Sequence, residues 1–339
     1  GETLKSLAGK LAIVMEGVSA DATTQDANVT INYAAADDTS GAVLGAIPGI
    51  TAKVDGQTLS ADDLHVTLNV SNTAQLGQVA HAAVDLNHAG IDTVQLDLAD
   101  QTNFDALFES NSGLSVSLDE VRNGDLVINT HGQTLTNTNA ASYTNSNAAL
   151  NGKGGIAAQG TTTLTTGDLN NEAGYIGSKG VLTAVSANIS NQSGQIQGLD
   201  NITLTAGNGS TTGKFNNTGG LVRSAATVSI NAGEINNSNT SSTNQGIEGQ
   251  DVSIASAKLN NSSGAIRANN NVSVTSAGFV DNTLGLISSG NVLTLQDTQA
   301  QTSRTLAITN THGILIADQT LSVAASSLSG DGKALSQND

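Results

Sequence analysis

The sequence contains no cysteine, one proline, and few aromatic or charged residues. Without cysteine, neither a disulfide framework nor thiol chemistry is available. Aromatic residues make up 2% of the 339 residues and tryptophan is absent, whereas a compact enzyme of this length usually places more aromatic area in its core. The single proline, Pro48, suits a chain whose backbone N–H groups nearly all lie in β-ladders. These absences favour a thin, regular core of Val, Ile, Leu and Ala.

Charge is sparse and unevenly distributed. The formal net charge of −17 opposes binding to nucleic acid or anionic lipid, so no nucleic-acid partner is expected. Residues 1–125 hold 18 acidic and 4 basic residues, or −14, and residues 126–339 hold 11 and 8, or −3. Asparagine follows the opposite trend, with 8 residues in the first part and 28 in the second. This shift predicts a domain boundary near residue 125.

The acidic first part is predicted to be a smaller mixed α+β domain. Alternating apolar and polar residues predict strands over 10–15, 27–33, 64–70, 91–98 and 114–118. Apolar residues at helical spacing over 76–86, after an N-cap at Asn72 and before Gly90, predict a helix. A short second helix is predicted around Phe104–Phe108.

From about residue 150 the chain repeats itself. In seven units an apolar residue is followed two places later by asparagine, and in six of them five places later by glycine. The apolar residues are Leu169, Ile189, Phe215, Ile235, Leu259, Val280 and Ile308. The asparagines are Asn171, Asn191, Asn217, Asn237, Asn261, Asn282 and Asn310, and the glycines are Gly174, Gly194, Gly220, Gly264, Gly285 and Gly313. In the exceptional unit Thr240 takes the glycine place, and six inserted residues are counted before Gly246 restores the pattern.

One unit of roughly 20 residues is typical of one coil of a parallel β-helix. Short alternating strands precede the apolar residues, at 162–165, 181–185, 202–205, 228–230, 252–254 and 272–274. We therefore predict a right-handed parallel β-helix over 126–339. The asparagines are expected at corners with left-handed backbone and with amides stacked along the axis, and the glycines at the remaining positive-φ positions. One corner hydrogen bond predicts a cost of about 1 kcal/mol for Asn261→Ala.

The repeat resembles the haemagglutinin repeats of filamentous haemagglutinin and of contact-dependent growth inhibition exoproteins. The segments 169–176, 189–196 and 259–266 carry the resemblance, which extends over about 150–316. It implies two-partner secretion through an outer-membrane transporter and display as a monomeric rod on the bacterial surface. It also implies a receptor on a host cell or a neighbouring bacterium, with the adhesin and toxin-delivery roles both open.

Several residues are candidates for chemical sites. The segment 207–214 has the wrong spacing for a phosphate loop and is interpreted as a corner loop. Arg223, Glu248 and Arg267 are predicted to form a charged column on one face, most simply an ion-pair ladder. The five histidines, His65, His81, His88, His131 and His312, form no metal-binding motif, and the pairs Asp37–Asp38 and Asp62–Asp63 leave calcium binding in the acidic part open.

The composition and the repeat together predict a structural stalk rather than an enzyme. No catalytic residue, cofactor or metal is assigned. Recognition is placed in the acidic part, because irregular loops carry function while solenoid coils mostly carry length. That part is either a recognition module or a folded insertion. Two alternatives remain open: a polysaccharide-active β-helix enzyme, and the passenger of a single-chain autotransporter.

Overall fold

A computed structural model describes residues 156–207 and 212–336, and ten separate strands before them. Two compact units result: residues 1–170 with 175–179, and residues 171–174 with 180–339. The predicted boundary near residue 125 rests on composition and stays a prediction. Among the described residues, no helix is long and apolar enough to cross a membrane.

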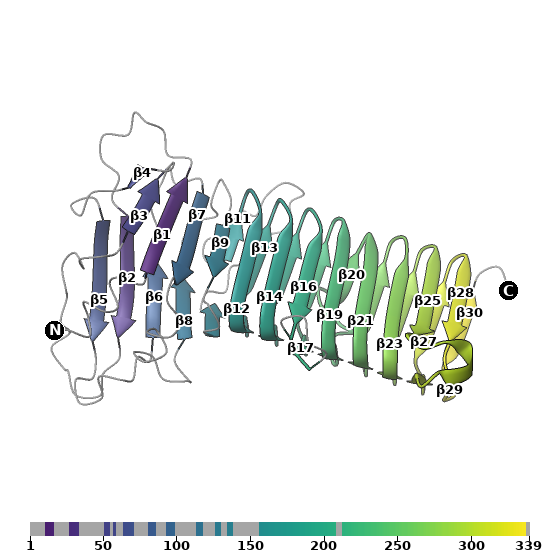
Figure 1. The fold of residues 1–339 in the computed structure, drawn as a ribbon. Helices are drawn as coiled ribbons and strands as arrows, with labels where there is room; N and C mark the ends of the chain where they lie inside the picture. The colour runs from purple at the N-terminus through teal and green to yellow at the C-terminus, as the bar shows by residue number, and fades with distance from the viewer. Residues whose placement is uncertain are drawn as a thin grey trace. The chain divides into compact units, whose positions relative to one another are not determined.

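Parallel β-sheets dominate the protein and form a β-solenoid of about eight turns, which confirms the predicted fold class of the repeat region (Figure 1). In the second unit, the first sheet alternates along the chain with a second sheet. The first sheet consists of β14 (Leu182–Ser190), β16 (Ile202–Ala206), β17 (Lys214–Asn216), β19 (Thr227–Asn236), β21 (Asp251–Asn260), β23 (Val272–Asp281), β25 (Val292–Asp297), β26 (Ala307–Thr309), β28 (Thr320–Ala324) and β29 (Ser327–Ser329). The second sheet consists of β15 (Gln195–Gly198), β18 (Leu221–Ser224), β20 (Gly246–Gly249), β22 (Ala265–Ala268), β24 (Leu286–Ser289), β27 (Ile314–Ala317) and β30 (Lys333–Ser336). A single 3₁₀ turn, η1 (Gln301–Ser303), lies between β25 and β26.

The core consists of columns of identical or similar apolar residues from successive turns. In β21 and β23, for example, Val252 lies beside Val272, Ile254 beside Val274, and Leu259 beside Val280. All six side chains are buried. Burying one such side chain contributes about 1.5–3 kcal/mol, and a single turn has no second layer to bury it against. Stacking of turns therefore provides the core.

The long strands of the first sheet are longer than predicted. The predicted segments at 228–230 and 252–254 begin β19 and β21, and both strands continue through the buried apolar residue of the repeat, Ile235 or Leu259. Each strand then ends one residue before the repeat asparagine. The asparagine consequently sits at the bend between the two sheets.

In the first unit, each predicted strand segment overlaps a strand of the structure. The strands are β1 (Leu11–Glu16), β2 (Ala27–Tyr33), β3 (Thr51–Val54), β4 (Gln57–Thr58), β5 (Leu64–Val70), β6 (His81–Asp85), β7 (Thr93–Leu98), β8 (Gly113–Ser117), β9 (Leu126–Asn129), β10 (Thr134–Asn137), β11 (Ile156–Ala158), β12 (Thr162–Asn170) and β13 (Tyr175–Ser178). The strands β9 and β10 pair in parallel with successive stretches of β12, and β7 and β8 pair in parallel with β9 and β10.

The predicted helix over 76–86 is wrong where the structure describes it. Residues 81–85 form strand β6, which pairs in parallel with β8 from His81↔Gly113 to Asp85↔Ser117. Intrinsic helix propensity is weak compared with tertiary contacts, even for alanine, and pairing with a distant strand outweighs it here. The rest of that helix, its N-cap at Asn72, and the helix around Phe104–Phe108 lie outside the described residues.

Candidate functional site

The seven repeat asparagines form one continuous ladder of side-chain amides. Each Nδ2 donates to the Oδ1 of the asparagine one turn later: the distances are 2.6 Å from Asn171 to Asn191, 2.7 Å on to Asn217, 2.8 Å to Asn237, 2.8 Å to Asn261, 2.7 Å to Asn282 and 2.8 Å to Asn310. Six of the seven side chains are fully buried and the seventh, Asn310, nearly so. Buried amides are tolerated because each finds its partner in the next turn.

Each ladder amide also donates to the backbone of the second sheet in the next turn. Asn237 Nδ2 donates to the carbonyl of Ala265 at 3.0 Å, and Asn261 Nδ2 donates to the carbonyl of Leu286 at 3.2 Å. Asn191, Asn282 and Asn310 make the equivalent bond. One amide therefore joins its own turn to the asparagine corner and to the second sheet of the following turn.

The positive-φ positions are neither the repeat asparagines nor the repeat glycines, so that expectation is wrong. The left-handed residue is the one immediately before the glycine place, four places after the apolar residue: Ala173, Ser193, Gly219, Asn239, Ser263, Leu284 and His312, with φ from 50° to 63°. This turn places the repeat glycine N–H on the asparagine carbonyl, as in Gly264 N to Asn261 O at 2.9 Å. The variety of side chains shows that the turn is held by its hydrogen bonds rather than by glycine.

The repeat glycines are required by space. A Cβ built on Gly264 would lie 2.2 Å from the carbonyl oxygen of Asn237 and 2.5 Å from Oδ1 of Asn261. Gly194, Gly220, Gly285 and Gly313 face the same two groups at 2.0–2.6 Å. The backbone of one turn thus packs directly on the asparagine corner of the turn before, and any side chain there would separate the turns.

In the exceptional turn, the hydroxyl of Thr240 makes two hydrogen bonds in place of the glycine backbone. Its Oγ1 donates to the carbonyl of Asn237 at 2.8 Å and accepts from Ala265 N at 3.1 Å. In the other turns the glycine N–H and the glycine carbonyl perform these two roles, as Gly264 does for Asn261 O and Leu286 N. Gly246 pairs with Leu221, one place after Gly220, so the insertion comprises the five residues 241–245 rather than six.

Asn137 is a ladder-type residue outside the seven predicted repeat units. It is buried, it follows the buried Leu135 by two places, and its Nδ2 donates to the carbonyl of Tyr175 at 2.7 Å. Tyr175 stands four places after Asn171, which is the backbone contact that the other ladder amides make. The apolar–asparagine spacing was present in the sequence, but Ala140 occupies the place of the repeat glycine.

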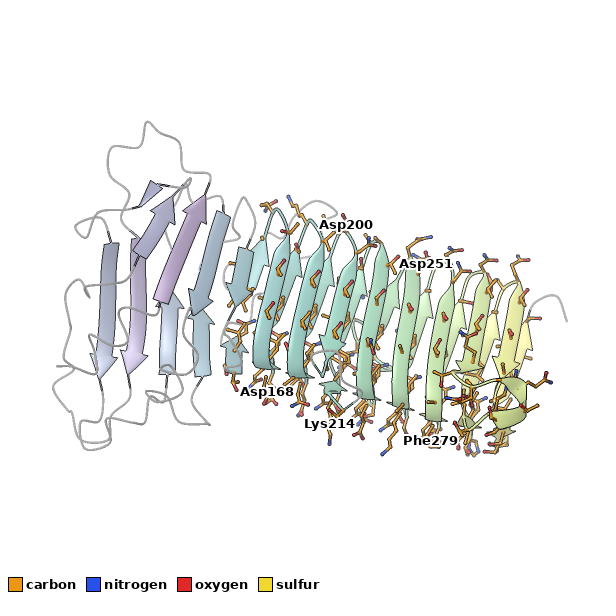
Figure 2. All side chains as sticks on the ribbon, viewed as in Figure 1. Asp168, Asp200, Lys214, Asp251 and Phe279 are labelled. Carbon is orange, nitrogen blue, oxygen red and sulfur yellow. The ribbon has the colours of Figure 1, made fainter. Side chains whose placement is uncertain are left out.

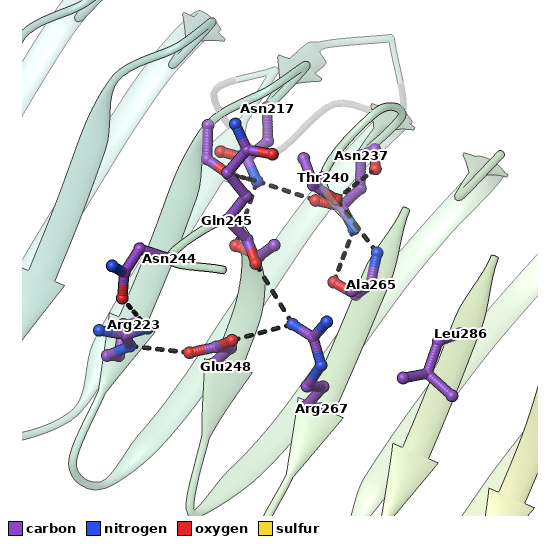
Figure 3. Close-up of polar contacts among 12 residues, drawn as sticks. Asn217, Arg223, Asn237, Thr240, Asn244, Gln245, Glu248, Ala265, Arg267 and Leu286 are labelled. Atoms are coloured by element: carbon purple, nitrogen blue, oxygen red, sulfur yellow. Dashed lines mark hydrogen bonds and ion pairs between the residues drawn. The ribbon is translucent and has the colours of Figure 1, made fainter. Parts of the chain in front are cut away.

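Arg223, Glu248 and Arg267 form the predicted charged column (Figure 3). They are register partners on β18, β20 and β22. Arg223 Nε lies 2.7 Å from Glu248 Oε2, and Arg267 Nη1 lies 2.9 Å from Glu248 Oε1. The inserted residues add two contacts: Arg223 Nη2 donates to Asn244 Oδ1 at 3.2 Å, and Arg267 Nη1 donates to the carbonyl of Gln245 at 3.3 Å.

A second column crosses the outer face of the first sheet. Lys214, Glu234, Lys258 and Phe279 are successive register partners, and Lys214 and Phe279 project from the same edge of the second unit (Figure 2). Lys214 Nζ lies 3.6 Å from Glu234 Oε2, with both side chains well exposed. A pair this exposed contributes little to stability.

Two segments leave the first sheet and return to it. One lies between β16 and β17, which both pair with β14, and overlaps the segment 207–214. Residues 208–211 of that segment lie outside the described residues. The other is 298–306, between β25 and β26, which both pair with β23. Insertions at one place in the turn leave the sheet pairing intact.

Asp297 anchors the 298–306 segment. Its register partner in the previous turn is Ser276, so a buried carboxylate replaces a buried hydroxyl. The carboxylate accepts from the backbone N–H groups of Gln299, Thr305 and Leu306. Burial raises the pKa of Asp297, but these three N–H groups and the positive charge of Arg304 outweigh it and lower the pKa below the ordinary value of 3.8.

The other candidates are not brought together. Within the described part of the chain, no group of three or more His, Cys, Asp or Glu residues could hold a metal ion. His312 forms an exposed pair with Asp331, at 3.3 Å from Nε2 to Oδ2. His65 and His81 lie on strands β5 and β6. The remaining candidates, His88, His131, Asp37–Asp38 and Asp62–Asp63, lie outside the described residues.

No protein-family model, curated protein or solved structure matches the chain.

Proposed function

We propose that this chain is a segment of a secreted bacterial surface filament, in which the solenoid is a stalk that holds other domains away from the cell. The asparagine ladder supports this role most directly. It joins seven successive turns through buried hydrogen bonds of 2.6–2.8 Å. At about 4.8 Å per turn, the six steps between these asparagines cover about 29 Å.

A solenoid suits this role because its length is set by the number of turns and each turn contacts only its neighbours. Export through an outer-membrane transporter, and use as an adhesin or a toxin-delivery stalk, belong to the same proposal and rest on the repeat resemblance. Recognition of a host or bacterial receptor is assigned to the acidic part. We propose no enzymatic activity, because general acid–base chemistry needs convergent groups in a cleft rather than an ion-paired column on a sheet.

The test is to change the length of the solenoid by whole turns. Residues 237–281 run from one ladder asparagine to the residue before an equivalent one, Asn282, and comprise two turns. Inserting one, two or four further copies after residue 281 keeps the register and adds about 10 Å per copy. The variants are displayed on bacteria with an epitope tag beyond residue 339, and tag accessibility to an antibody is measured by flow cytometry.

Accessibility should rise stepwise with length at equal amounts of displayed protein. The matched control carries flexible Gly-Ser insertions of the same numbers of residues, whose extension grows with the square root of their length, so accessibility should not rise in equal steps. Equal accessibility for all lengths, with the repeat turns themselves binding labelled host or bacterial cells, would contradict a stalk and place recognition on the coil faces.

A further inference from the structure

Along the second-sheet strands from β15 to β27, the outer face carries charged side chains in one column only. The outward positions of these strands are otherwise glutamine, leucine, glycine, alanine, serine or isoleucine. Arg223, Glu248 and Arg267 are the exceptions, and they fall in three successive turns. The five-residue insertion 241–245 occurs in the middle one of these turns. The charge and the insertion therefore coincide.

The column carries one net positive charge, because two guanidinium groups share one carboxylate. Both carboxylate oxygens are occupied, Oε2 by Arg223 and Oε1 by Arg267. The side chains are about one third exposed for both arginines and 21% exposed for Glu248. The carboxylate is thus the least accessible member, and the two cations face solvent.

Each arginine keeps unused donors. A guanidinium has five N–H groups. Among the described residues, Arg223 makes hydrogen bonds through Nε and Nη2 only, and Arg267 through Nη1 only. Arg223 Nη1, together with Nε and Nη2 of Arg267, remains available. The contacts to Asn244 and Gln245 orient both guanidinium groups, so the free N–H groups are held in place before any ligand arrives (Figure 3).

We propose that Arg223 and Arg267 form a binding site for an oxyanion group, either a free ion or an acidic group on a larger ligand, beside Glu248. Guanidinium groups match sulfate, phosphate and carboxylate through paired N–H donors. The two arginines lie two strand spacings apart, about 10 Å, so an extended acidic ligand along the axis contacts both. The site is independent of the proposed stalk role.

The test uses the full chain and sodium sulfate as the probe, titrated calorimetrically at constant ionic strength set with sodium chloride. Saturable binding is expected for the unmodified protein and should be lost in the double variant Arg223→Gln, Arg267→Gln. Glu248→Gln removes the competing carboxylate and should tighten sulfate binding about tenfold. Lys214→Gln is the matched control, because it removes an exposed ion-paired cation on the other sheet, and it should bind sulfate like the unmodified protein.

Two further measurements keep the outcome decisive. Arg223→Lys keeps the charge but loses the paired donors, so it should weaken sulfate binding while the circular dichroism spectrum stays unchanged. Dextran sulfate distinguishes the source: much tighter binding than sulfate alone identifies an extended ligand, and equal binding per sulfate identifies a free ion. Sulfate binding that is absent, or equal in the double variant and in Lys214→Gln, overturns the site. Weaker binding by Glu248→Gln in a folded protein also overturns it.

Discussion

Replacing Asn261 with alanine tests the asparagine ladder at its centre. The structure gives this amide three contacts: its Oδ1 accepts from Asn237 Nδ2 at 2.8 Å, and its Nδ2 donates to Asn282 Oδ1 at 2.7 Å and to Leu286 O at 3.2 Å. The estimate of about 1 kcal/mol from one corner hydrogen bond is therefore too low. The side chain is fully buried, so water does not replace the lost partners.

The expected magnitude follows from the groups that the substitution leaves behind. Asn282 Oδ1 loses its side-chain donor, and one N–H of Asn237 loses its acceptor while the other stays on Ala265 O. A buried polar group without a partner costs about 1–3 kcal/mol, so Asn261→Ala should destabilise the protein by about 2–6 kcal/mol. The carbonyl of Leu286 also loses the Asn261 donor, which adds to the loss of stability.

Urea unfolding followed by circular dichroism measures the effect. The matched control is Asn260→Ala, because Asn260 is adjacent, only partly buried, and accepts one bond, from Ser262 N at 2.9 Å. It should cost about 1 kcal/mol or less. Equal losses for Asn260→Ala and Asn261→Ala would refute the ladder as a source of stability.

Three further substitutions probe other parts of the fold. Gly220→Ala should destabilise the protein strongly, because the added Cβ would lie 2.2 Å from Asn191 O. Gly219→Asn should cost about 1 kcal/mol or less, because the nearest atom to its Cβ is 3.6 Å away. Thermal melting compares the two variants. Ile196→Asp should unfold neighbouring turns, since Ile196 is buried, and an unchanged melting curve would contradict the register. At pH values above the ordinary carboxyl pKa of 3.8, Asp297→Asn should lower the urea midpoint of unfolding. The difference from the unmodified protein should shrink as the pH falls through the lower folded-state pKa, because a depressed pKa stabilises only the ionised form. A difference that is independent of pH would mean that the charge of Asp297 does not hold the 298–306 segment.

The strands and their stacking were predictable because both depend on period and register. Alternation with a period of two identified 27–33 and 64–70 as strands with the bounds that β2 and β5 have. Counting from the apolar residues also placed Arg223, Glu248 and Arg267 in one column, which the ion pairs confirm. A solenoid makes such counting effective, because equivalent positions in successive turns are neighbours in space.

The errors came from features that the local sequence does not contain. Strand β6 depends on pairing with β8, about 30 residues further along the chain, while its own residues follow a helical spacing. The role of the repeat glycines depends on a carbonyl of the preceding turn, such as Asn237 O against Gly264. The contacts of Asn244 and Gln245 with the arginines depend on the path of an insertion, which has no counterpart in the other turns.

The ladder also explains how the solenoid accommodates insertions. Successive ladder asparagines are separated by 20, 26, 20, 24, 21 and 28 residues, yet their amide distances stay within 2.6–2.8 Å. The three longest separations contain the segment between β16 and β17, the insertion 241–245, and the segment 298–306. Extra residues therefore leave the asparagine ladder unchanged. Because the ladder does not depend on these segments, their length and chemistry differ from turn to turn, and the arginine contacts made by 241–245 are an example of a surface feature built in this way.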